Sequence, residues 1–150
     1  MHRLWEPLAA KQRPSNGYAG KFSTPYCIAV GFVRGNVGLD AFTDQAVSDA
    51  EVRKLAAKIR YRIDPANPYP NAYTGHIRAT LGDGRTLEER QPHLRGGAQA
   101  PLSRAELEEK FALNARHGGW REPRIEAART LARTLWDDAS LDLAALRGTD

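Results

Sequence analysis

The sequence lacks most of the patterns that identify a familiar catalytic or metal centre. Its single cysteine, Cys27, excludes an intramolecular disulfide and a metal site built from several cysteines. The four histidines (His2, His76, His93 and His117) fall in different predicted elements without ligand spacing, so no metal site is predicted. A phosphate-binding glycine loop, a G-x-S-x-G elbow and an H-E-x-x-H helix are also missing, and no cofactor is predicted.

Long apolar runs and clustered charge are missing too. No stretch approaches the roughly 18 apolar residues of a membrane span. The first residues lack the apolar core of a secretory signal, so we expect a soluble cytoplasmic protein. The net charge of +4 comes from basic residues that are scattered along the chain among acidic ones. This mixture is typical of a solvated surface and predicts no nucleic-acid partner.

The least polar stretch, residues 20–35, predicts a helix with a polar beginning. Ser23 is a good N-cap, Pro25 is tolerated in a first turn, and Gly35 ends the pattern. The body of this helix is apolar nearly all round, so we expect it to be buried on most sides. The preceding twenty residues are interrupted by proline and glycine and are predicted to be irregular.

The middle of the chain predicts one more helix and three strands. Ser48 and Glu51 form a capping box before a second helix. The hydrophobic period then changes to two in residues 59–63, which predicts a strand. Alternation resumes from Thr74, and the Asp83-Gly84 pair predicts a tight turn into a returning strand over 86–91.

The last third predicts further helices. A second capping box, Ser103 and Glu106, starts one helix, which Gly118-Gly119 ends. Pro123 can open the last long helix. Ser140 is expected to cap a short terminal turn that runs through Leu146.

These elements predict the α+β class, with helices packed on a small antiparallel sheet and helices at the C-terminus. We expect a principal α+β domain over residues 1–120 and a C-terminal helical segment over 121–150.

By its local sequence alone, Tyr26 is best interpreted as a core aromatic and Lys21 as a solvated charge.

Three motifs, in order and at compatible spacing, resemble the C-terminal part of the MmgE/PrpD family. They are the K-F-S-x-P-Y opening at 21–26, the L-x-D-G-R hairpin at 81–85, and R-G-x-x-x-x-P-L-S followed by E-L-x-x-K-F over 95–111. The resemblance covers residues 14 to about 120, and the last helix fits weakly.

The resemblance implies an enzyme fragment. The family includes 2-methylcitrate dehydratase, cis-aconitate decarboxylase and iminodisuccinate epimerase, which move protons next to carboxylates without a metal. It implies a small α+β lid that closes over a large helical domain. Tyr26 then corresponds to the motif tyrosine that faces the cleft, a catalytic candidate at the cleft rim that could donate a hydrogen bond or proton. Lys21 and Ser23 become substrate-binding candidates at a helix N-terminus, which favours carboxylates.

The chain departs from the family in length, because most of the family's active-site region lies upstream of the matching part. Three interpretations follow: a lid fragment that is inactive alone, a subunit that completes a separately encoded helical domain, or a binding module that reuses the lid fold. A small polycarboxylate is the expected ligand once a helical domain is present. The apolar face of the helix that Pro123 opens is expected to pair with a second copy, giving a homo-oligomer.

Overall fold

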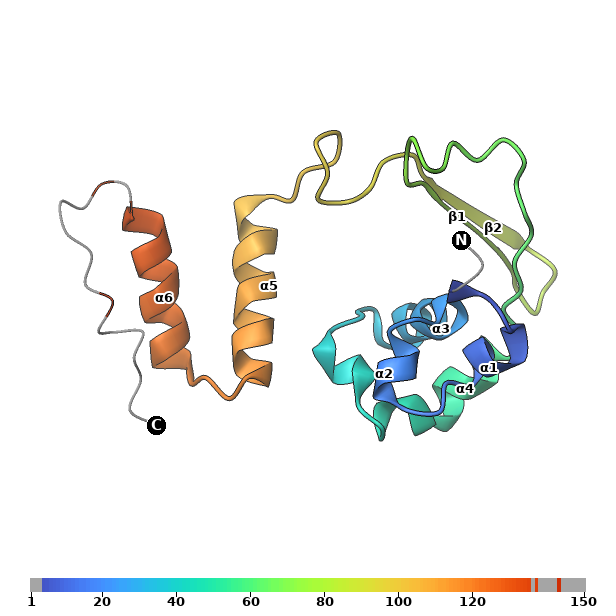
Figure 1. Cartoon of the computed structure of the whole chain (residues 1–150), viewed down its shortest axis with the longest axis horizontal. Helices are drawn as coiled ribbons and strands as arrows, with labels where there is room; N and C mark the ends of the chain where they lie inside the picture. The colour runs from blue at the N-terminus through green and yellow to red at the C-terminus, as the bar shows by residue number, and fades with distance from the viewer. Residues whose placement is uncertain (1–3, 136, 138–142, 144–150) are drawn as a thin grey trace. The chain divides into compact units, whose positions relative to one another are not determined.

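The computed structural model describes residues 4–135, 137 and 143 of the chain. Its contacts divide the chain into two units: Ile63–Glu109, and a helical unit formed by Met1–Arg62 with Lys110–Asp150. Figure 1 shows the elements: a group of helices, then one hairpin, then two more helices, which confirms the α+β class. In chain order they are α1 (Leu8–Gln12), α2 (Gly17–Gly20), α3 (Thr24–Arg34), the 3₁₀ helices η2 (Leu39–Phe42) and η3 (Ala46–Ser48), α4 (Ala50–Ala56), β1 (Gly75–Thr80), β2 (Thr86–Gln91), α5 (Arg104–His117) and α6 (Glu122–Thr134).

Helix α3 begins and ends where the sequence predicts. The Ser23 hydroxyl accepts a hydrogen bond from the Tyr26 amide at 3.1 Å, and Gly35 closes the helix with a φ of +72°. One face is buried, but the expectation of burial on most sides is wrong, because Phe32 on another face is 59% exposed.

The helical core lies between α3, η2, η3 and α4. Its fully buried members come from a short part of the sequence: Tyr26, Ala29, Val30, Ala41, Val47, Val52 and Ala56, with Ile59 packed against them. Gly17 lies so close to the Phe42 carbonyl that a Cβ atom there would be 2.0 Å from the oxygen. Glycine is therefore required where α2 crosses η2.

The first twenty residues are more regular than predicted, since they contain α1 and α2. Asn16 starts α2 by accepting a hydrogen bond from the Ala19 amide at 2.8 Å. The side chain of Gln12, at the end of α1, donates to the carbonyls of Ala57 and Ile59 at 3.2 and 2.7 Å.

That contact also explains why the predicted strand over 59–63 does not form. The Ile59 carbonyl accepts from Gln12, and the Ile59 amide donates to the Ala56 carbonyl at 3.1 Å. Residues 59–64 have no strand partner, so the described sheet has two strands instead of three. The alternation of apolar and basic residues was a misleading signal.

Helix α4 uses a different cap from the predicted one. Asp49, not Ser48, holds the helix N-terminus, accepting from the amides of Glu51 and Val52 at 2.9 and 3.1 Å. Ser48 instead donates its hydroxyl to the Asp44 carbonyl at 3.0 Å. The two candidate caps are adjacent, so the sequence placed the start of the helix nearly correctly and assigned the wrong side chain.

The hairpin confirms the predicted turn. Strands β1 and β2 pair antiparallel from Gly75↔Gln91 to Thr80↔Thr86, and Gly84 has a φ of +85°. No residue described within Ile63–Glu109 is buried, and no strand residue belongs to the helical core. The expected packing of helices on the sheet is therefore not what builds the core; the helices form it among themselves.

The last two helices begin at the predicted signals, and α5 also ends where the sequence predicts. Ser103 and Glu106 form the reciprocal capping box before α5, and Gly119, with a φ of +85°, follows its end. Pro123 lies in the first turn of α6. The expected turn from Ser140 to Leu146 lies outside the described residues.

Candidate functional site

The predicted catalytic residue, Tyr26, lies in the core of the helical unit. Its side chain is fully buried, and its hydroxyl donates to the Ala41 carbonyl at 2.5 Å. Burial raises the pKa of the phenol, because a phenolate would be desolvated there. The expected position at the rim of a cleft is wrong: a non-local bond to η2 turns the ring inward. A catalytic role stays a prediction, and it requires this bond to open.

Ser23, a predicted substrate ligand, is buried and fully used by the fold. Its hydroxyl accepts from the Tyr26 amide and donates in a short hydrogen bond to the Lys11 carbonyl. The side chain thus joins the end of α1 to the start of α3. The Tyr26 amide in the first turn of α3 already donates to its own chain, so it is not available to the carboxylate that the sequence led us to expect there.

Lys21, the second predicted ligand, is exposed. It follows α2, and its sequence neighbour Phe22 makes a tilted ring contact with Tyr18, with centroids 5.2 Å apart and both side chains exposed. Of the three predicted site residues, Lys21 alone presents its functional group to solvent. The three residues are close in the sequence, but the side chains of Ser23 and Tyr26 are buried and only that of Lys21 is exposed.

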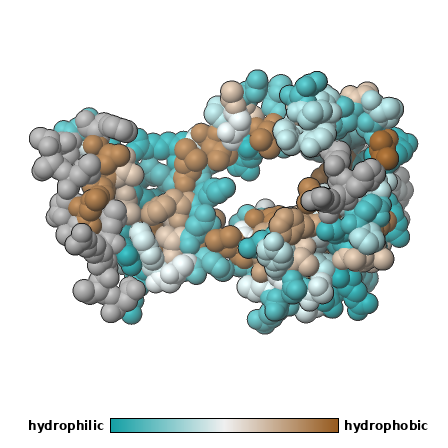
Figure 2. Space-filling view, in the orientation of Figure 1, coloured by the Kyte–Doolittle hydropathy of each residue, from teal (hydrophilic) through white to brown (hydrophobic). Residues whose placement is uncertain are grey.

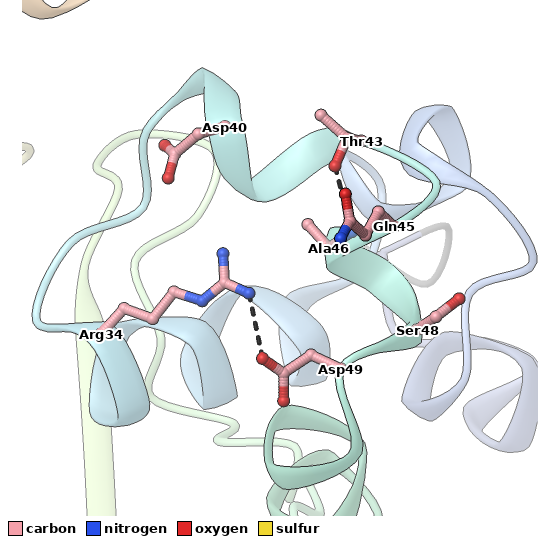
Figure 3. Close-up of a pocket in the computed structure, with 7 residues that line it drawn as sticks. All are labelled: Arg34, Asp40, Thr43, Gln45, Ala46, Ser48 and Asp49. Atoms are coloured by element: carbon pink, nitrogen blue, oxygen red, sulfur yellow. Dashed lines mark hydrogen bonds and ion pairs between the residues drawn. The ribbon is translucent and has the colours of Figure 1, made fainter.

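An open pocket of the helical unit lies at the other end of α3. It has a volume of about 530 Å³ and is lined by Arg34, Asp40, Thr43, Gln45, Ala46, Ser48 and Asp49 (Figure 3). The Arg34 guanidinium projects into it and donates to the Asp49 carboxylate at 3.1 Å. Asp40 lies on the opposite wall of the pocket, across from the guanidinium, in Figure 3.

This pocket does not suit a polycarboxylate. Arg34 is its single cation, whereas Asp40 and Asp49 carry two negative charges, so the lining is net negative. Hydrogen bonds from the Val52 amide and from Arg34 hold the pKa of Asp49 below its usual value, which keeps it ionised. We interpret the Arg34–Asp49 pair as a clamp between the end of α3 and the start of α4.

A second polar cluster lies on one face of the hairpin. The Oε2 atom of Glu88 lies 2.9 Å from Arg78 Nε and 2.8 Å from Arg78 Nη2, both of which donate to it. Its Oε1 atom accepts a hydrogen bond from Arg90 Nη2 at 2.9 Å. His76 Nε2 lies 2.9 Å from the same Oε1. These hydrogen bonds, with Arg78 first, lower the pKa of Glu88 to about 2. Sequence reasoning missed this cluster, although the predicted alternation of the first strand already placed His76 and Arg78 on one face.

The described residues offer little else for chemistry. They contain no group of three or more histidine, cysteine or acidic side chains placed to hold a metal ion. Cys27 is half-buried, and burial raises the pKa of its thiol, which disfavours the reactive thiolate. None of the described helices is both long enough and apolar enough to span a bilayer.

Comparison with known proteins gives one consistent result. The MmgE/PrpD C-terminal domain family matches residues 2–137. Cis-aconitate decarboxylase from Mus musculus is 30% identical over 139 residues, which are 90% of this chain and 28% of that protein. The Homo sapiens protein of the same name is 30% identical over 68% of this chain and 21% of its own length. The chain thus spans less than a third of each of these relatives.

Proposed function

Since the chain belongs to the MmgE/PrpD family, whose C-terminal domain it contains, we propose that it is the lid part of a lyase or isomerase acting on small polycarboxylic acids. The observation that carries this proposal is the match over residues 2–137, together with the similarity to two cis-aconitate decarboxylases. The proposed chemistry is proton transfer next to a carboxylate, and the protein is proposed to act in the cytoplasm.

The domain is proposed to need a helical domain for activity. Most of the length of the two relatives has no counterpart in this chain. The described residues supply one predicted acid, Tyr26, and its hydroxyl is engaged by Ala41. A proton abstracted from the substrate needs a base as well, which the helical domain is proposed to provide.

Lys21 is the best candidate in this chain for contact with the substrate. It is exposed, and an ammonium group can bind a carboxylate. Ser23 is proposed to act indirectly, by holding the backbone on which Lys21 lies. The candidate acids are cis-aconitate, which the relatives' name indicates, and 2-methylcitrate, which the family resemblance indicates.

The test is reconstitution. The 150-residue chain, a helical domain taken from a cis-aconitate decarboxylase, and an equimolar mixture of the two are each assayed with both acids. The proposal expects turnover in the mixture alone, and a clear loss of it with Lys21→Ala. Turnover by the isolated chain would contradict the need for a helical domain, whereas an inactive but assembled mixture would contradict the enzymatic role.

A stand-alone binding module is the second candidate, favoured by one observation: the buried core around Tyr26 is formed by described residues of this chain. A homo-oligomer is proposed in either case. The sequence placed the pairing face on α6, but Ile125 of that face is buried, with 1% exposed. The proposal therefore rests on the apolar side chains that α5 exposes (Figure 2), among them Leu107 and Phe111, which are 53% and 38% exposed. Light scattering on the pure chain tests this, and a strict monomer at high concentration would count against it.

A further inference from the structure

The hairpin carries a polar face formed by three successive cross-strand pairs. The antiparallel register pairs Arg78 with Glu88, and the flanking same-face pairs are His76 with Arg90 and Thr80 with Thr86. Alternate residues of a strand point to the same side, so all six side chains share one face. The other face carries the apolar side chains Ile77, Ala79 and Leu87.

Cations outnumber the single anion on this face. Two arginines and one histidine surround one carboxylate, which leaves a net charge of +1 with His76 neutral and +2 with it protonated. Glu89 belongs to the other face, because it pairs with Ile77. Its carboxylate is therefore not one of the groups that converge on this face.

The donors converge on one carboxylate. Each arginine directs its Nε and Nη2 at one oxygen of Glu88: Arg78 at Oε2 and Arg90 at Oε1. Arginine is suited to carboxylates because its planar fork donates several hydrogen bonds in a fixed geometry. The hairpin thus places several donors around one point suited to a carboxylate, and the carboxylate of Glu88 lies at that point.

We propose that this face, Arg78, Arg90 and His76 with Glu88 as internal occupant, is a binding site for a small polycarboxylate. The choice of a polycarboxylate rests on the proposed function. A ligand carboxylate shares or replaces the contacts of Glu88, and the remaining charge of the face attracts a second carboxylate. The next pair along the strands, Thr80 and Thr86, lies about 7 Å further on and offers hydroxyl donors to the rest of the acid.

The role of Glu88 makes the proposal testable, since the internal occupant competes with the ligand. Citrate is titrated into the whole chain at low salt, with amide shifts of residues 76–90 as the readout. Glu88→Gln is expected to bind citrate about fivefold more tightly, the factor that corresponds to one surface ion pair. Arg78→Gln is expected to lose the shifts. Arg85→Gln is the matched control, because Arg85 pairs with Asp83 in the turn and lies outside the face.

Acetate and inorganic phosphate at equal ionic strength complete the experiment. Weaker binding of both than of citrate supports the site, and phosphate binding as tight as citrate assigns a general anion patch and overturns it. Equal affinity in Glu88→Gln and the unmodified chain, or equal loss in Arg78→Gln and Arg85→Gln, also overturns it. If Glu88→Gln opens the hairpin, the comparison of the two arginine variants decides alone. None of these measurements depends on turnover, so a failure of citrate to bind the hairpin is distinguishable from a failure of the reconstituted enzyme to turn over its substrate.

Discussion

Replacing Tyr26 by phenylalanine removes one oxygen atom and tests the most consequential placement in the structure. The Tyr26 hydroxyl is fully buried, and its acceptor, the Ala41 carbonyl, belongs to a residue only 1% exposed. The lost hydrogen bond costs about 0.5–1.5 kcal/mol, and a buried carbonyl left without a partner costs about 1–3 kcal/mol. Since these two costs overlap, we expect the free energy of unfolding to fall by about 2 kcal/mol.

Urea unfolding followed by far-ultraviolet circular dichroism measures this change. With an m-value of about 2 kcal/mol per molar, the midpoint falls by about 1 M. Tyr18→Phe is the control, because Tyr18 is 72% exposed and its variant should stay within about 0.5 kcal/mol of the unmodified chain. If Tyr26→Phe is as mild as Tyr18→Phe, the hydroxyl is not held by Ala41, and the sequence-based position at a cleft rim regains its basis.

The dependence of stability on pH in the alkaline range gives an independent check on the Tyr26 hydroxyl. Burial raises the pKa of Tyr26 above the usual value of 10.0, so the folded chain keeps the phenolic proton to higher pH than the unfolded chain does. Its contribution to stability is complete below pH 10 and is lost as pH rises through the folded pKa. The unmodified chain should lose more stability above pH 10 than Tyr26→Phe does, and identical losses would contradict the burial.

Three further predictions concern the backbone and the ion pairs. Gly17→Ala should destabilise the chain strongly, because its Cβ would overlap the Phe42 carbonyl. Gly31→Ala should be neutral or stabilising, because its Cβ has room and alanine favours the helix; thermal unfolding of both variants measures the difference. Asp49→Ala should lower the urea midpoint by removing the cap of α4, and Asp49→Asn should retain part of it; equal losses would contradict a capping role. Glu88, with a pKa of about 2, should titrate by nuclear magnetic resonance well below the usual 4.5, and its contribution to hairpin stability should be complete above pH 4.5 and lost only as pH falls toward 2.

Local signals in the sequence predicted the ends of elements well. Ser23 and Gly35 at the ends of α3 and Gly84 in the hairpin turn all lie where propensity places them. Each depends on hydrogen bonds or dihedral angles within a few residues, which the sequence displays directly. The family resemblance through the three motifs was confirmed by the match over residues 2–137.

Contacts between distant residues were not predictable in the same way. The Tyr26 hydroxyl meets Ala41 fifteen residues away, and Gln12 reaches Ile59 across forty-seven. The local sequence favoured a core aromatic at Tyr26, which the structure confirms, whereas the rim position came from the family resemblance and was wrong. Nothing in the neighbourhood of Ile59 specifies its partner Gln12, so the third strand was wrong. Strand alternation could have found the face around Glu88, but it required reading β1 and β2 together in register.

The short sequence span of the helical core has a consequence for the order of folding during synthesis. The buried cluster runs from Tyr26 to Ala56, with Ile59 beside it, and needs no residue from the hairpin or from α5 and α6. Contacts close in sequence form quickly, and chains fold N-terminal parts first as they leave the ribosome. The core can therefore assemble once Ile59 has emerged, while the hairpin is still being translated. A ribosome arrested shortly afterwards would already hold a folded helical nascent chain.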